Sequence, residues 1–180
     1  MASDLNAKKL WLLPRKRVNE MRAITLYQPW ALLIALLLKR FETRSWATQY
    51  RGEIAIHAGA ERSYWNELER ELKGYRNGKY TGGNGSLADL YWQYQSGGLP
   101  GGERLNEPMV FGAVMCIVKV VDCIPMTRDF IGQQTPSERA FGGWSAGRFA
   151  WKLEMVEVFK QPIPAKGGQG IWHWKREGVA

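Results

Sequence analysis

The sequence has little of what usually builds metal sites and disulfides: its 180 residues include two cysteines and two histidines. Cys116 and Cys123 lie in one apolar stretch, and their odd spacing places them on opposite faces of a strand, where they do not pair. Such sparse cysteine is typical of a reducing compartment, so we expect a cytoplasmic protein. Because His57 and His173 belong to no Cys/His/Asp pattern of metal ligands, we expect neither a metal nor another cofactor.

Long apolar runs are also missing. The longest uninterrupted one covers the eight residues 31–38, which is too short to span a bilayer. Residues 1–20 are basic but have no apolar core of a secretory signal, and the chain shows no internal repeat. We therefore expect no membrane partner.

Aromatic and basic side chains are, by contrast, abundant. Nine tryptophans and seven tyrosines exceed what a core of this size needs, and amphipathic rings suit pockets and stacking platforms. The net charge is +8, of which the first twenty residues contribute +3. A basic domain favours polyanions such as nucleic acid, although a basic surface without an acidic partner is an equally good interpretation.

The pattern of the chain predicts one domain at residues 21–174, between a basic tail at 1–20 and a short tail at 175–180. Residues 73–109 are rich in glycine and resemble an insertion. The remaining pattern predicts strands at 21–27, 41–46, 53–57, 110–124, 149–159 and 170–174, helices at 29–38, 60–73 and 87–94, a helical turn at 127–132 and a loop at 135–148.

Strands outnumber crossover helices in this order, which argues against a doubly wound sheet. We expect an α+β fold: a small mixed β-barrel of about six strands, with the wholly apolar helix 29–38 buried and the amphipathic helix 60–73 at the periphery.

Three charged residues close the apolar stretch and form the first candidate site. Glu42 and Arg44 are two apart in a strand, so they share a face and can pair, and Lys39 is close enough to join them. Charges near buried surface are costly unless they pair or meet a ligand. The cluster is either a site for phosphates and base edges or a structural ion-pair network.

Other side chains extend this candidate site. Trp30 and Trp46 flank the charges and either stack a base or pack in the core. Gln28 either reads a base edge with its amide or caps the helix. Arg148 either enlarges the basic surface or is simply solvated. His57 is a general base or, more commonly for such a residue, a structural histidine.

Residues 37–44, Leu-Leu-Lys-Arg-Phe-Glu-Thr-Arg, resemble the Gly-x-Lys-x-x-Glu-x-Arg signature of the ASCH domain family, a branch of the PUA-like β-barrel superfamily. The resemblance also includes residues 28–30, 50–57 and 147–151, and it extends over most of 21–174 except the insertion. Leu37 in place of the glycine is the visible departure, and it alters how the chain turns out of the helix.

This resemblance implies a PUA-like barrel that binds RNA or other nucleic acid, or a modified nucleoside, in a basic, aromatic-lined cleft. The residues expected at the cleft are Gln28, Trp30, Lys39, Glu42, Arg44, Trp46 and Arg148.

The alternative implied by the family is a hydrolase, acting on an acylated cytidine or on RNA, with Lys39 and Glu42 as the catalytic residues. Family members that hydrolyse acyl-cytidine have a threonine three residues after the lysine, and here that position is Glu42. The neighbouring Thr43 is expected on the opposite face of its strand. The sequence decides neither whether the chain is an enzyme nor what its oligomeric state is.

Overall fold

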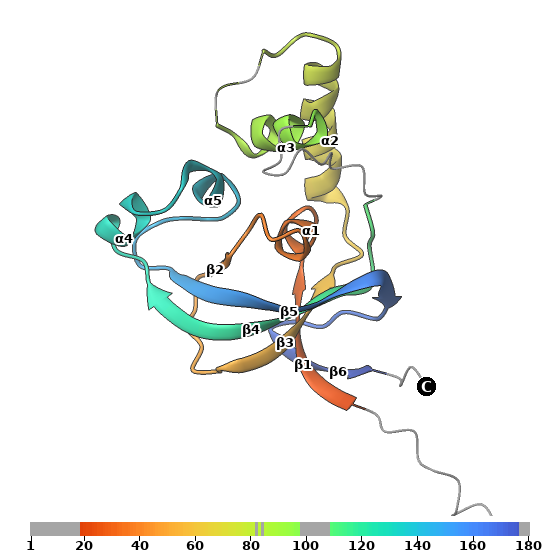
Figure 1. The fold of residues 1–180 in the computed structure, drawn as a ribbon, viewed down its shortest axis with the longest axis vertical. Coiled ribbons are helices and arrows are strands. Elements are labelled where there is room, and N and C mark those ends of the chain that lie inside the picture. Colours follow the sequence, from red (N-terminus) through yellow and green to blue (C-terminus); the bar gives the residue numbers. More distant parts are fainter. Residues whose placement is uncertain (1–18, 82, 84, 98–108, 177–180) are drawn as a thin grey trace, which may run out of the picture.

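The computed structural model describes residues 19–81, 83, 85–97 and 109–176, and Figure 1 shows the path of the chain. The strands are β1 (Asn19–Leu26), β2 (Phe41–Arg44), β3 (Gly52–Ala58), β4 (Ala113–Pro125), β5 (Phe149–Pro164) and β6 (Ile171–Arg176). The helices are α1 (Trp30–Ala35), α2 (Ser63–Arg76), α3 (Leu87–Gln95), α4 (Arg128–Gly132) and α5 (Pro136–Ala140).

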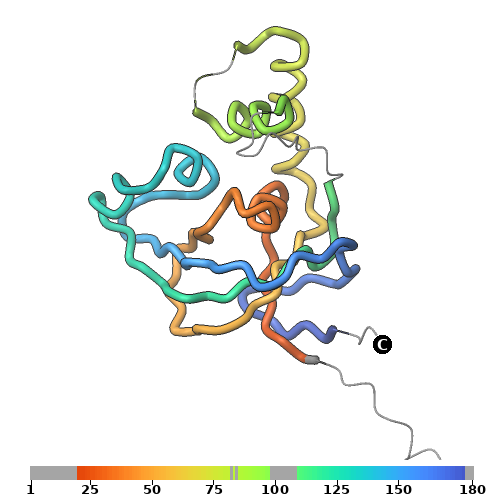
Figure 2. Tube along the Cα trace, viewed as in Figure 1, coloured from red at the N-terminus to blue at the C-terminus, as the bar shows by residue number. Residues whose placement is uncertain are grey.

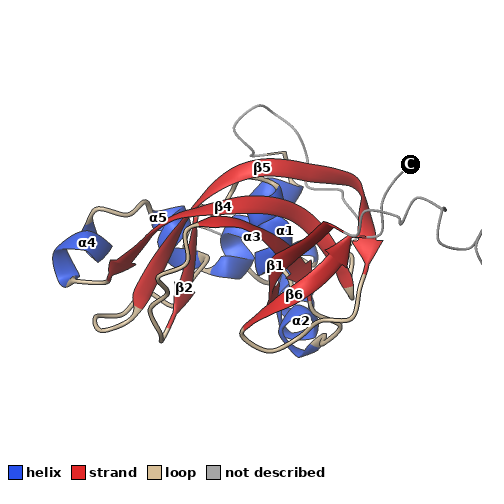
Figure 3. Ribbon diagram, turned by 90° about the horizontal axis from the view of Figure 1, so that it is seen from below, coloured by secondary structure: helices blue, strands red, loops and turns tan. Residues whose placement is uncertain are grey.

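The six strands form one mixed sheet in the order β2-β5-β4-β3-β1-β6. β1 and β3 run parallel, whereas the other neighbours are antiparallel. The α+β class and the six strands expected from the sequence are confirmed. Figure 3 shows the long strands β4 and β5 curving over the others.

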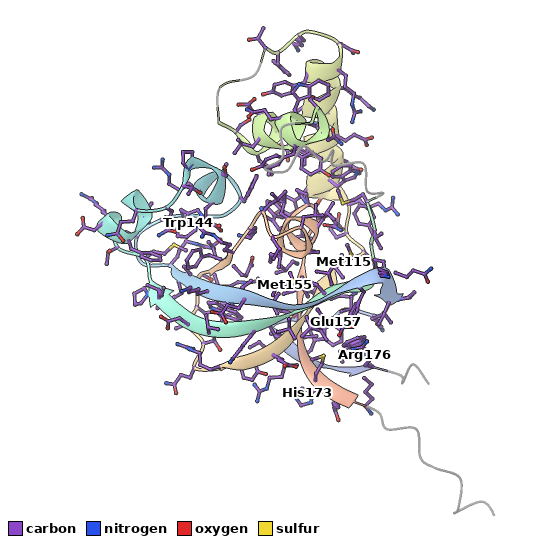
Figure 4. All side chains as sticks on the ribbon, in the orientation of Figure 1. Met115, Trp144, Met155, Glu157, His173 and Arg176 are labelled. Carbon is purple, nitrogen blue, oxygen red and sulfur yellow. The ribbon has the colours of Figure 1, made fainter. Side chains whose placement is uncertain are left out.

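The expected closed barrel is wrong, because β2 and β6 remain the two edges of the sheet. Side chains of β6 nevertheless contact side chains of β5, although the two strands are four positions apart in the sheet order. The Arg176 guanidinium meets the Glu157 carboxylate at 2.9 and 3.1 Å (Figure 4), and the rings of Phe159 and Trp174 lie 6.3 Å apart. Register shifts in the β4–β5 ladder increase the curl of the sheet. Side chains, rather than backbone hydrogen bonds, then connect β5 with β6.

Helix α1 has no polar face, and the structure covers it on two sides. Leu32 and Ile34 belong to the cluster packed on the sheet. Leu33 instead belongs to a second cluster with Leu72 of α2 and Tyr91 of α3. Helices α2 and α3 therefore lie over α1, on the side away from the sheet (Figure 1). Part of the glycine-rich segment 73–109 thus contributes to a hydrophobic cluster, while its residues 98–108 lie outside the described part of the chain.

The end of α1 differs from the prediction, since the helix stops at Ala35 and not at residue 38. The N–H groups of Leu38 and Lys39 both donate to the carbonyl of Leu33, at 2.9 and 3.1 Å. Between them and the helix, Leu37 has a φ of +62°, in the left-handed region that glycine adopts most easily. The family signature has its glycine at this position, so the departure at Leu37 stores strain in the turn that leads to Lys39.

Replacing Leu37 with glycine is expected to raise the free energy of unfolding by about 1 kcal/mol relative to Leu37→Ala. The alanine variant is the matched control because the Leu37 side chain is 63% exposed and both substitutions remove it. Urea unfolding of the two variants checks the effect, and equal midpoints would show that the turn is not strained.

Several boundaries moved by a few residues. β1 begins at Asn19 instead of residue 21, and β5 continues through Pro162 to Pro164. The segment 135–148, expected as loop, contains the short helix α5. Residues 1–18 and 177–180 of the expected tails lie outside the described ranges, so the division into tails and domain stays a prediction.

No helix within residues 19–81, 85–97 and 109–176 combines the length and apolar character needed to cross a bilayer.

Candidate functional site

The edge strand β2 carries the charged cluster expected from the sequence. The Glu42 carboxylate lies 3.0 Å from Nε of Arg44 and 3.8 Å from Nζ of Lys39. Glu42 and Arg44 therefore share a face of the strand, as their spacing predicts. Because β2 ends at Arg44, Trp46 falls beyond the strand and outside this cluster.

Lys39 is the most deeply buried cation of the cluster, with only 2% of the residue exposed. Its ammonium group donates to the carbonyl of Phe41 at 2.5 Å. Burial lowers the pKa of Lys39 below its ordinary value, the Glu42 and Glu138 carboxylates act in the opposite direction, and Arg44 adds to the lowering. A ligand that brings an acceptor or a negative charge to Nζ therefore stabilises an ammonium that has lost most of its water.

Glu138, which the sequence prediction missed, fixes the start of β2. Its buried carboxylate accepts hydrogen bonds from the N–H groups of Arg40 (3.0 Å) and Phe41 (3.1 Å). It reaches them from α5, where the Thr135 hydroxyl caps the helix by accepting from the N–H of Glu138 at 3.1 Å. The Thr-x-x-Glu pattern of 135–138 is a capping signature, so sequence could have found the helix, but not the long-range contact.

A cavity of about 260 Å³ opens beside this cluster. The segment from β1 through α1 to β2, traced in Figure 2, supplies half of its lining residues: Tyr27, Trp30, Lys39, Glu42 and Thr43. Its lining is polar and charged in one part and aromatic in another: Tyr27, Trp30, Lys39, Glu42, Thr43, Tyr64, Phe141, Gly142, Gly143 and Arg148. We call it the lysine cavity.

Two exposed tyrosines and one tryptophan of the aromatic lining contact one another. Tyr27 and Tyr64 are 45% and 47% exposed, and their ring centroids are 4.9 Å apart. Trp30 meets Tyr64 edge to face at 5.3 Å. The sequence prediction missed both tyrosines. Tyr64 lies on α2, far along the chain, and nothing in its pattern marks the contact, whereas Tyr27 lies next to the predicted Gln28 and was not singled out.

The structure brings four of the seven expected site residues to the lysine cavity: Trp30, Lys39, Glu42 and Arg148. Arg148 donates to the carbonyls of Gly143 (3.0 Å) and Thr43 (3.3 Å). It thereby holds the segment between α5 and β5 against β2. Arg44 lines a neighbouring cavity instead.

Gln28 and Trp46 are not part of the lining. The buried Gln28 amide accepts from the N–H of Leu32 (3.1 Å) and donates to the carbonyl of Val110 (2.6 Å). Gln28 thus satisfies an N–H in the first turn of α1, which is the capping alternative, and its place in a binding site stays a prediction. Trp46 packs edge to face against Trp151, with ring centroids 4.7 Å apart.

Thr43 is a further side chain at the lysine cavity. It was expected to face away from the charged cluster, yet it lines the same cavity as Lys39 and Glu42. Its hydroxyl accepts from the N–H of Gly143 at 2.9 Å, and a Cβ on Gly142 would lie 2.9 Å from its methyl group. Because β2 is an edge strand, the cavity reaches both of its faces.

The two cysteines are free and both lie on β4. Burial raises the pKa of the Cys116 thiol to about 12, so it remains protonated at neutral pH and unsuited to nucleophilic attack. Within the described residues, no group of three or more His, Cys, Asp or Glu side chains lies close enough to hold a metal ion.

His57 occupies a buried position on β3, with 1% of the residue exposed. Its Nε2 lies 3.0 Å from the carbonyl of Ala165, so the proton is on Nε2, whereas Nδ1 has no hydrogen-bond partner. Burial lowers the pKa of His57, and the bond to Ala165 acts in the opposite direction. The ring is thus neutral at pH 7, and its contacts are those of a structural histidine.

The lowered pKa of His57 predicts a pH-dependent stability. Below about pH 6.5 the unfolded chain binds a proton at this histidine more readily than the folded chain does. The free energy of unfolding should therefore be highest above pH 7 and fall as the pH drops from 7 to 5. Urea titrations at pH 7, 6 and 5 measure the slope.

His57→Gln should flatten that slope, because the variant has no ring to protonate. His173→Gln is the matched control, since His173 is 63% exposed and lies 3.2 Å from Glu20. An unchanged slope in His57→Gln would show that another group causes the pH dependence.

The family model of the ASCH domain matches residues 24–163, which include every residue of the lysine cavity, and it confirms the resemblance seen at residues 37–44. No curated protein matches the chain.

Proposed function

Because the chain belongs to the ASCH domain family, we propose that it binds nucleic acid, preferentially RNA, by taking one base into the lysine cavity. The volume of about 260 Å³ lies just below the range of about 300–1,000 Å³ typical of sites for drug-sized ligands. A single base or nucleoside suits such a space better than a large cofactor.

The observation that carries the proposal is the pairing of two chemistries in one cavity. The buried ion pair of Lys39 and Glu42 offers a donor to a base carbonyl and an acceptor to an exocyclic amine. Tyr27 and Tyr64 offer exposed rings on which a base can stack. Arg148, at the same cavity, supplies a further cation for the sugar or phosphate.

Hydrolysis of an acylated nucleoside, or of RNA, is the second candidate, and the position of Thr43 favours it. Thr43 and Lys39 line one cavity, and burial lowers the pKa of Lys39, which is the direction that favours a lysine acting as a general base. Glu42 would then stabilise the protonated amine.

Titration by calorimetry tests the proposal with the four ribonucleosides, acetylated cytidine and an eight-nucleotide RNA. We expect saturable binding of at least one nucleoside with little salt dependence, and binding of the RNA that weakens steeply with salt. Failure of every nucleoside and of the RNA to bind contradicts the proposal. Acetate release from acetylated cytidine faster than in buffer, and lost in Glu42→Gln, would support the hydrolase instead.

A further inference from the structure

A second, larger cavity of about 590 Å³ adjoins the lysine cavity. It lies between the end of β1 and residues 165–170, which connect β5 to β6; we call it the glycine-turn cavity. Tyr27 lines both cavities. Arg44 lines the glycine-turn cavity, whereas Glu42, its ion-pair partner at 3.0 Å, lines the lysine cavity. Tyr27 and this ion pair therefore form a wall that the two cavities share.

The turn at residues 165–170 forms one side of this cavity, and two of its glycines pack directly against neighbouring aromatic rings. A Cβ on Gly167 would lie 2.7 Å from Cε1 of His57, and one on Gly168 would lie 2.8 Å from Cγ of Trp172. The Thr25 hydroxyl accepts from the N–H of Gly168 (3.3 Å) and from the indole N–H of Trp172 (3.1 Å). The turn is thus seated on partly buried polar groups, and a side chain at Gly167 or Gly168 would collide with His57 or Trp172.

Two cations and one carboxylate line the glycine-turn cavity: Arg44, Lys166 and Glu61. Nε of Arg44 faces Glu42, and Nη2 donates to the carbonyl of Thr25 at 3.4 Å. Within the described residues, the Nη1 end of this guanidinium makes no hydrogen bond. A guanidinium held at one end and free at the other is well suited to bind a phosphate.

A buried histidine under the turn adds an unused polar atom. His57 lines the cavity, and its Nδ1 has no partner although the residue is 1% exposed. Gly167 is the residue that packs against this edge of the ring. An unsatisfied acceptor therefore lies directly beneath the turn.

From these features we propose that the glycine-turn cavity is a backbone subsite. It binds the phosphodiester and sugar of the nucleotide next to the one whose base enters the lysine cavity. The inference rests on the proposed function and narrows it: the ligand is a single strand of at least two nucleotides, not a free nucleoside. Arg44 and Lys166 neutralise the phosphate, and Tyr27 lies between the two nucleotides.

The test compares a nucleoside with the corresponding dinucleoside monophosphate, as RNA and as DNA, by calorimetry. The parent should bind the RNA dinucleotide at least tenfold more tightly than the nucleoside. Lys166→Ser should reduce dinucleotide affinity three- to tenfold and leave nucleoside affinity unchanged. Each phosphate contact that is lost should also reduce the salt slope by about one. Lys175→Ser is the control, because Lys175 is an exposed lysine of β6 outside the lining.

Combining Arg44→Gln with Lys166→Ser should remove the dinucleotide advantage altogether. If the DNA dinucleotide exceeds its nucleoside in affinity by as much as the RNA dinucleotide does, the phosphodiester causes the effect. If only the RNA dinucleotide binds more tightly than its nucleoside, the ribose contributes as well. Both results support the subsite. Nucleoside binding without a dinucleotide advantage overturns the subsite alone. An advantage that survives the double substitution also overturns it. If neither ligand binds the parent, the proposed function fails, and the subsite with it.

Discussion

Replacing Lys39 with methionine is expected to weaken nucleoside binding by about ten- to a hundredfold. Lys39 lines the lysine cavity, and a hydrogen bond to a charged group contributes about 1.5–3 kcal/mol. Methionine has a similar length and fills the same buried space without the cost of burying a charge. Glu42 keeps a partner, because Arg44 remains 3.0 Å away.

Calorimetry measures the loss, and urea unfolding verifies that the variant is folded. Lys152→Met is the matched control: Lys152 is exposed and lies opposite Phe41 in the β2–β5 ladder. It should bind as the parent does. A folded Lys39→Met variant whose affinity stays within twofold of the parent would remove Lys39 from the binding site.

Replacing Glu138 with alanine is expected to lower the free energy of unfolding by about 3 kcal/mol. The substitution leaves the N–H groups of Arg40 and Phe41 without their acceptor, and each buried unsatisfied donor costs about 1–3 kcal/mol. Because these two residues follow Lys39 directly, nucleoside affinity should fall as well.

Urea unfolding measures the effect of Glu138→Ala against two other variants. Glu138→Gln keeps one acceptor oxygen and should lose less stability than the alanine variant. Arg139→Ala, an exposed position on the same helix, should change stability by less than about 0.5 kcal/mol. If Glu138→Ala were as stable as Arg139→Ala, the carboxylate would not hold β2 in place.

Local patterns predicted the parts of the site that depend on neighbouring residues. The pair of Glu42 and Arg44 follows from the two-residue period of any strand. The burial of α1 follows from an apolar run with no polar face. The helix boundary was missed because Leu37, a residue that gives no turn signal, adopts the left-handed conformation.

Contacts between distant segments were beyond the sequence pattern. Glu138 and Phe41 are 97 residues apart, and Tyr64 reaches the cavity from α2. The open sheet depends on how far the bulged strands β4 and β5 curl, which alternation alone does not encode. Thr43 was expected on the face away from Glu42, and the sequence pattern could not show that the cavity extends around the edge strand β2 to reach it.

The most direct test of base binding in the lysine cavity is a crystal structure of the protein soaked with the nucleoside that binds most tightly. We expect density for the base against Tyr27 or Tyr64, with its edge within hydrogen-bond distance of Lys39 Nζ or a Glu42 carboxylate oxygen. A base bound elsewhere on the protein, with the lysine cavity unchanged, would contradict the proposed site.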